Sequence, residues 1–207
     1  MEFLPEGIRK WYLNLINPAV NFFIRIEINP NHLTTVGFLI QLFTVYFLAN
    51  GHLFIAGWLI LLAGTCDIVD GKVARARAVG TKFGALYDST LDRYSEFAMF
   101  FGIGYYFIKN EFYFSTIVAF LALGGSLMTS YIRARSEGLG LECKVGSMQR
   151  PERIVYIGLA SIFSSFPYID IYPLLIVLWG IAVMSNLTAF QRLKHVYYST
   201  NRGKDLL

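Results

Sequence analysis

Long apolar segments separated by short polar turns dominate the chain. Six such segments can be distinguished, and they cover residues 33–49, 53–78, 82–109, 112–135, 154–166 and 174–193. An α-helix needs about 20 mostly apolar residues to cross a bilayer. Backbone polar groups in lipid must be satisfied within the segment, so each spanning segment is expected to be helical. The pattern therefore predicts an all-α integral membrane protein with six transmembrane helices.

Residues 1–28 mix aromatic and aliphatic side chains with charged ones and are interrupted at Pro18. This composition predicts an N-terminal amphipathic helix lying at the membrane interface, and a helix that simply packs on the bundle is the alternative. We expect no cleaved signal peptide, because the segment lacks a continuous apolar core. Pro30 should end this region, with Asn31 or Thr34 capping the next helix.

The composition agrees with a membrane location. The 207 residues are 55% hydrophobic and only 15% charged, whereas soluble domains carry about 25% charged residues. We predict one domain over residues 1–207, with the juxtamembrane helix in 1–28 and a six-helix bundle in 29–207. Cys66 and Cys143 are far apart and are predicted to be free thiols.

Basic residues indicate how the predicted helices are oriented. All of the 18 Lys and Arg residues except Lys109 fall in the N-terminus, the turn near residue 80, the 136–153 loop, the C-terminus or adjacent helix ends. The positive-inside rule therefore places both termini at the cytoplasmic face. We expect the membrane to be a prokaryotic inner or cell membrane.

Four aspartates stand at the same predicted membrane face. Asp67 and Asp70 are three residues apart, and Asp88 and Asp92 are four apart, so each pair projects from one helical face. Ionisable groups at membrane depth are costly and mark functional sites. Facing carboxylates need cations between them, and such hard oxygen ligands suit Mg²⁺, Mn²⁺ or Ca²⁺.

Small residues and one arginine accompany these carboxylates. Gly71, Ala74 and Gly84 either bring helices close together or leave room for a bulky ligand. Arg75 is either a salt-bridge partner of the aspartates or a bidentate phosphate ligand.

The string Asp67-x-x-Asp70-Gly71-x-x-Ala74-Arg75, followed by Gly84-x-x-x-Asp88-x-x-x-Asp92, resembles the signature of the CDP-alcohol phosphotransferase family at every fixed position. The resemblance implies that an alcohol hydroxyl displaces CMP from a CDP-diacylglycerol-type lipid. It also implies two bound divalent ions, Mg²⁺ or alternatively Mn²⁺, and a homodimer. By the same resemblance Asp67, Asp70, Asp88 and Asp92 are the metal ligands, and Asp92 is also the general base. The residues expected around the CDP group are Thr34, Asp70, Gly71, Ala74, Arg75 and Gly84.

A second polar cluster is expected where the last three helices end. Five arginines there exceed what topology requires, and they favour an acceptor that is itself phosphorylated. The segments SYIRAR, RPER and QR resemble those of the phosphatidylinositol phosphate synthase subfamily, although Arg133 stands where Lys is expected. This resemblance implies inositol 1-phosphate as acceptor, bound by Ser130, Arg133, Arg135, Arg150, Arg153 and Arg192.

Other functions remain open at this point. Glycerol 3-phosphate, inositol or serine are alternative acceptors, and a CDP-linked ether lipid is an alternative donor. Outside the enzymes, a divalent-cation transporter is the competing interpretation, but it predicts acidic groups spread across the bilayer depth. Membrane lipids are expected partners, and nucleic acid is not.

Overall fold

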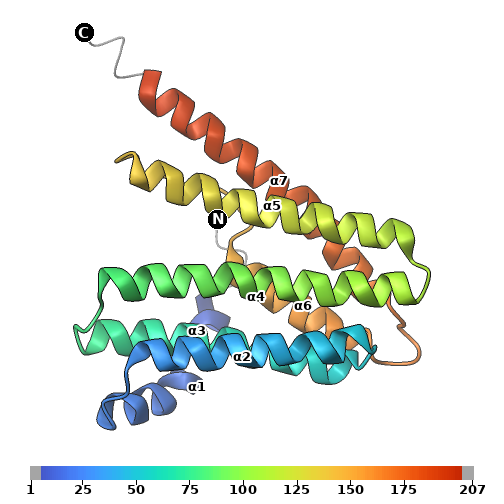
Figure 1. The fold of residues 1–207 in the computed structure, drawn as a ribbon, viewed down its shortest axis with the longest axis horizontal. Coiled ribbons are helices and arrows are strands. Elements are labelled where there is room, and N and C mark those ends of the chain that lie inside the picture. Colours follow the sequence, from blue (N-terminus) through green and yellow to red (C-terminus); the bar gives the residue numbers. More distant parts are fainter. Residues whose placement is uncertain (1–5, 202–207) are drawn as a thin grey trace.

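Seven α-helices make up the described part of the protein. The computed structural model describes residues 6–201, and within that range it contains helices and turns but no strands (Figure 1). The helices are α1 (Glu6–Arg25), α2 (Pro30–Ala49), α3 (Leu53–Ala76), α4 (Lys82–Lys109), α5 (Tyr113–Gly138), α6 (Arg150–Phe163) and α7 (Tyr172–Asn201). The all-α prediction is therefore confirmed, and a helix follows each of the predicted turns.

The helix boundaries follow from local capping. Asn29 caps α2, because its side chain accepts a hydrogen bond from the backbone N–H of Asn31. The predicted caps Asn31 and Thr34 are wrong: Pro30 takes the first helical position, where its missing N–H costs nothing, so the cap lies before it. Thr81 caps α4 by accepting from the N–H of Gly84 at 2.9 Å.

Four of the helices are long and apolar enough to cross a membrane, namely α2, α3, α5 and α7. The chain is thus an integral membrane protein, while the predicted count of six spans is not confirmed. Two helices account for the difference. α6 has only 14 residues, and α4 carries four charged residues, Asp88, Asp92, Arg93 and Glu96, within residues 88–96.

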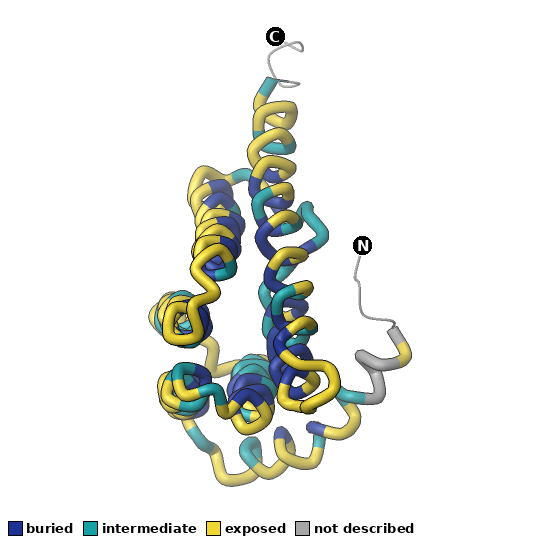
Figure 2. Tube along the Cα trace, turned by 90° about the vertical axis from the view of Figure 1, so that its right-hand side faces the viewer, coloured by how far each residue is buried: buried dark blue, intermediate teal, exposed yellow. Residues whose placement is uncertain are grey.

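Buried residues line the inward faces of the helices, and exposed residues lie outside (Figure 2). Many of the exposed side chains are large and apolar, such as Phe43, Trp58, Phe114, Ile176 and Phe190. A soluble protein rarely exposes so much apolar surface, so these faces are suited to lipid.

α3 is the helix around which the site is arranged. It packs against α6 with almost no side-chain space, because a Cβ on Gly57 would lie 2.5 Å from the carbonyl oxygen of Gly158. α3 also packs on α2, and the short turn after it brings the start of α4 to the same end of the bundle, at the left in Figure 1.

α1 packs along the second half of α3, which is the half predicted to lie towards the cytoplasm. Its Tyr12 hydroxyl is 2.6 Å from the Thr65 hydroxyl, and its Asn17 accepts a hydrogen bond from Lys72 at 2.8 Å. Apolar side chains between them form a small second core. The predicted helix is present over residues 6–25, and residues 1–5 of the predicted range lie outside the described residues. Its packing on α3 supports the alternative in which it is a bundle-packing helix.

Candidate metal centre and nucleotide cavity

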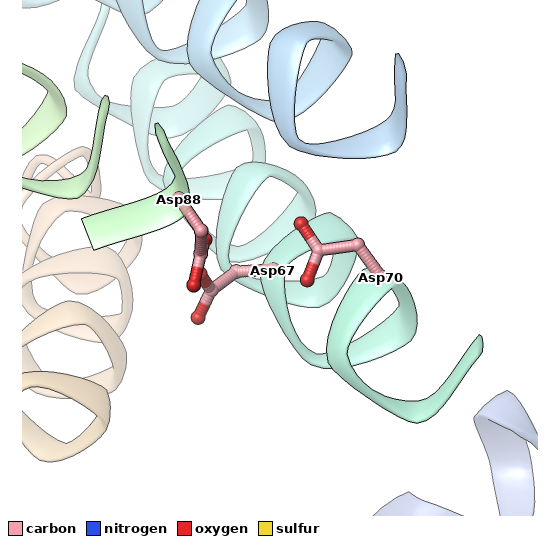
Figure 3. A group of neighbouring side chains, drawn as sticks. All are labelled: Asp67, Asp70 and Asp88. Carbon is pink, nitrogen blue, oxygen red and sulfur yellow. The ribbon is translucent and has the colours of Figure 1, made fainter. Parts of the chain in front are cut away.

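Three of the predicted metal ligands come together between α3 and α4. One carboxylate oxygen from each of Asp67, Asp70 and Asp88 lies within 4.8 Å of the other two. Figure 3 shows Asp67 and Asp70 projecting from α3, with the carboxylate of Asp88 close to that of Asp67. Three carboxylates at this separation repel one another unless cations lie between them, so the arrangement suits divalent metal ions.

The oxygen atoms of this cluster have partners to different degrees. Thr34 on α2 donates a hydrogen bond to Oδ2 of Asp70 at 2.5 Å, which orients that buried carboxylate. Oδ1 of Asp88, in contrast, is buried and has no hydrogen-bond partner among the described residues. A buried oxygen without a donor is costly, and a bound cation would satisfy it. The donor set therefore fits a divalent ion.

Asp92 lies one helical turn beyond Asp88 and is linked to the cluster through Arg150. The guanidinium of Arg150 is 3.0 Å from Oδ2 of Asp67 and 2.6 Å from Oδ1 of Asp92. Arg93 approaches Asp92 more loosely, at 3.9 Å. The three-carboxylate group thus does not include Asp92, but a single guanidinium holds Asp92 beside it.

A cavity of about 440 Å³ opens next to the aspartates. Five of the six residues predicted to surround the CDP group line it, namely Thr34, Asp70, Gly71, Ala74 and Gly84. Arg75 is not on its wall, although its guanidinium lies 3.3 Å from where a Cβ on Gly71 would be. The volume is typical of small-molecule sites, and the small residues provide the space.

A second, much smaller cavity of about 30 Å³ also borders the aspartates. It shares Thr34 and Asp70 with the larger cavity and is also lined by Asp67, Asp92 and Arg150. Thr34 and Asp70 therefore border both a nucleotide-sized cavity and a space that holds about one or two water molecules.

The predicted acceptor residues are distributed over three helices. Arg150 reaches the aspartates, whereas Arg153 is buried against Glu96 at 2.7 Å and donates to the carbonyl of Met148 at 3.1 Å. Arg192 donates to the carbonyls of Val145 and Thr129. The three remaining residues lie towards the end of α5: Ser130 is half-buried, Arg135 is exposed, and Arg133 pairs with Glu137 at 2.9 Å.

Glu96 was not singled out from the sequence. It extends the row of Asp88 and Asp92 by one further turn of α4, and only 3% of its side chain is exposed. A row of acidic residues at four-residue spacing was the available signal, because such residues share a helical face.

These features define a helical membrane protein with a metal-suited carboxylate cluster beside a nucleotide-sized cavity. The family model for CDP-alcohol phosphatidyltransferase matches residues 27–190. The chain belongs to this family and is a transferase, which confirms the resemblance read from the signature.

Relatives of known identity support a narrower group. A phosphatidylinositol phosphate synthase from Mycobacteroides abscessus is 33% identical over 203 residues, covering 96% of this chain and 90% of the relative. An archaetidylinositol phosphate synthase from Methanothermobacter thermautotrophicus is 37% identical over 155 residues, covering 72% of this chain and 77% of the relative.

Solved structures agree with the fold. The crystal structure of the Mycobacterium tuberculosis phosphatidylinositol phosphate synthase with CDP-DAG bound has a TM-score of 0.80 at 30% identity, covering 89% of this chain and 94% of that one. The same enzyme in complex with manganese and citrate has a TM-score of 0.77 at 30% identity, covering 87% and 88% of the two chains. The neighbour with manganese and the aspartate cluster of this chain together support the use of a divalent metal.

Proposed function

We propose that the protein transfers a phosphatidyl group from CDP-diacylglycerol to a hydroxyl of inositol 1-phosphate, releasing CMP and forming phosphatidylinositol phosphate. The observation that carries this proposal is a cluster of three metal-suited carboxylates, two of which, Asp70 and Asp88, lie on the wall of a cavity of about 440 Å³ that small residues line. A carboxylate cluster beside such a cavity is the arrangement needed to bind a nucleoside diphosphate through metal ions.

The metal site would hold two divalent ions, Mg²⁺ or alternatively Mn²⁺. Asp67, Asp70, Asp88 and Asp92 are the proposed ligands, and the unpartnered oxygen of Asp88 supports this assignment. When bound, the ions would neutralise the diphosphate and the charge that develops on the leaving CMP. Thr34 keeps Asp70 oriented for this task by its hydrogen bond.

Asp92 is the proposed general base. Its position one turn beyond Asp88 allows it to take the proton from the attacking hydroxyl while the other aspartates hold the donor. Arg150 bridges Asp92 and Asp67, so the contact fixes the position of the base relative to the metal ligands. Gly71, Ala74 and Gly84 would leave room for the nucleotide, and Arg75 lies over Gly71 at its edge.

The acceptor's phosphate would be bound by the arginine-bearing ends of α5, α6 and α7. The proposed residues are Ser130, Arg133, Arg135, Arg150, Arg153 and Arg192. Arg192 on α7 donates to the carbonyls of Thr129 on α5 and Val145 in the loop before α6, and these contacts bring the three elements together beside it. Such a concentration of positive charge favours a phosphorylated acceptor over inositol or serine.

The hydrocarbon chains of the lipid donor could be ether-linked instead of acyl. Because an archaetidylinositol phosphate synthase is 37% identical to this chain, a CDP-linked ether lipid is the second candidate donor. We further propose a single catalytic domain of six membrane spans over residues 29–207, preceded by the juxtamembrane helix of 1–28. Both termini and the active site would face the cytoplasm of a prokaryotic cell, and the protein would be a homodimer.

The test is an assay of CMP release by purified protein in detergent. Each reaction contains Mg²⁺ or Mn²⁺, one donor (CDP-diacylglycerol or its ether analogue) and one acceptor (inositol 1-phosphate, inositol, glycerol 3-phosphate or serine). We expect CMP only with a divalent ion and inositol 1-phosphate present together. Absence of CMP with every acceptor would overturn the proposed reaction, and CMP with glycerol 3-phosphate alone would overturn the acceptor assignment.

A further inference from the structure

Arg77 stands on the wall of the larger cavity, just beyond the end of α3. Its Nη1 donates a hydrogen bond to the Ile28 carbonyl at 2.7 Å, and its Nη2 is 3.9 Å from the Glu27 carboxylate. The side chain is 21% exposed. A guanidinium has five N–H donors, so these two contacts leave donors available to a ligand in the cavity.

The charges around the cavity give Arg77 a distinct position. Three carboxylates line the wall, from Glu27, Asp70 and Asp88, and Arg77 is the one basic residue among the described residues that line it. Metal ions would account for the two aspartates. Arg77 would then be the protein cation available to a phosphorylated nucleotide in the same cavity. Its planar guanidinium can donate two hydrogen bonds to phosphate oxygens.

The helical register explains why Arg77, and not Arg75, reaches this wall. Arg77 follows Asp70 by seven residues and Ala74 by three, which places all three on one face of a helix. Arg75 follows Asp70 by five residues, which places it off that face, and it does not line the cavity. The signature has no fixed position between Arg75 and Gly84, so the motif alone does not reveal the second arginine.

We propose that Arg77 binds a phosphate oxygen of the donor's nucleotide, with the Ile28 carbonyl holding its guanidinium at the cavity wall. The inference rests on the proposed use of a CDP-linked donor and adds a residue outside the family signature to its binding. The competing explanation is that Arg77 only fastens the linker between α1 and α2 to α3.

The experiment compares the binding of CMP with that of cytidine, which lacks the phosphate. Full-length protein in detergent with Mn²⁺ is titrated with each ligand, and donor KM, acceptor KM and thermal unfolding are measured on the same preparations. The variants are Arg77→Ala, Arg77→Lys and Glu27→Gln. Arg25→Ala is the matched control, because Arg25 is an exposed arginine at the end of α1, away from the cavity wall.

We expect Arg77→Ala to weaken CMP binding and raise the donor KM by about tenfold, the loss typical of one charge-assisted hydrogen bond. Cytidine affinity, acceptor KM and unfolding temperature should stay at the values of the Arg25→Ala control. Arg77→Lys should lose less, and Glu27→Gln should bind CMP as tightly as the unmodified protein, because it retains the guanidinium.

Three results would overturn the inference. The first is unchanged CMP affinity in Arg77→Ala, and the second is an equal loss for CMP and cytidine. The third is a loss of CMP affinity in both Arg77→Ala and Glu27→Gln together with a lowered unfolding temperature, because that result would mean that Arg77 only stabilises the fold. If the unmodified protein binds no CMP and releases none from the donor, the proposed function fails as well, so the two failures are distinguishable.

Discussion

The carboxylates of α3 and α4 and the arginines of α5, α6 and α7 differ in how far the protein already satisfies their polar atoms. Oδ1 of Asp88 is buried without a hydrogen-bond partner among the described residues, and a large cavity lies beside it. Arg192 and Arg153, in contrast, donate to backbone carbonyls and to Glu96. The aspartate region is therefore prepared for a ligand, whereas much of the arginine region also holds the bundle together.

This difference has a physical origin. Carboxylates accept hydrogen bonds and need donors or cations, and the apolar α2 and α3 offer few donors, so the cluster is left to metal ions. Guanidinium groups carry five donors each, and helix ends and loops offer many carbonyls. An arginine can therefore stabilise the fold and bind a ligand at the same time. An aspartate in an apolar bundle has few hydrogen-bond donors around it, so it depends more on a bound cation.

The largest effect should come from removing the proposed base. Asp92→Asn keeps the size and one oxygen of the side chain but cannot accept the hydroxyl proton, so kcat should fall by about 10²–10⁴-fold. Donor binding and the unfolding temperature should change little. The measurement is CMP release together with CDP-lipid binding, and Asp170→Asn at the opposite end of the bundle is the control. Normal turnover in Asp92→Asn would remove Asp92 from the role of base.

The next effect tests the structural side of the arginine region. Arg153 is 1% exposed and Glu96 is 3% exposed, so Arg153→Met leaves a buried carboxylate without its partner. Breaking such a pair typically costs about 3–5 kcal/mol of stability. The double variant Glu96→Leu with Arg153→Met removes both charges and should recover most of that loss. Thermal unfolding in detergent measures both, and a single variant as stable as the unmodified protein contradicts this prediction.

A smaller effect is expected at the edge of the aspartate region. Thr34→Val removes the hydroxyl that orients Asp70, and loss of such a supporting contact typically weakens metal affinity by about 10–100-fold. Thr35→Val is the matched control, because the Thr35 hydroxyl contacts Asn31 and Tyr87 instead. The Mn²⁺ concentration required for half-maximal CMP release measures the effect. Equal requirements in the two variants would show that the Thr34 contact does not support the metal.

The comparison also shows what the sequence could predict. Long apolar segments and Asn, Gly and Pro turns were enough to locate the helices, because backbone satisfaction in lipid leaves few alternatives. The signature drew attention to Asp67, Asp70 and Asp88, whose carboxylates lie together in the structure. Spacing on one helix explains why Asp67 and Asp70 share a face, and the short turn after α3 brings Asp88 to them. Helix ends were less predictable, as the Asn29 cap shows, because capping depends on local backbone geometry.

The contacts between distant helices were not predictable in the same way. Nothing in the spacing of α4 and α6 indicates that Arg150 reaches Asp67 and Asp92 while Arg153, one turn later, pairs with Glu96. Those contacts depend on how two helices cross in three dimensions. For the same reason, an arginine-rich helix end can be recognised from the sequence. The sequence does not tell how many of its N–H donors remain available to a ligand.

The smallest effect should appear where the two roles of an arginine coincide. Arg192→Lys keeps the positive charge but loses the fork that reaches the carbonyls of Thr129 and Val145 together. If Arg192 also binds the acceptor's phosphate, the acceptor KM should rise by about threefold to tenfold while the donor KM stays constant. Lys194→Gln, an exposed neighbour on α7, is the control. If the acceptor KM rises only in variants whose unfolding temperature falls, Arg192 has a structural role alone. The acceptor's phosphate would then be bound by Arg133, Arg135 and Arg150.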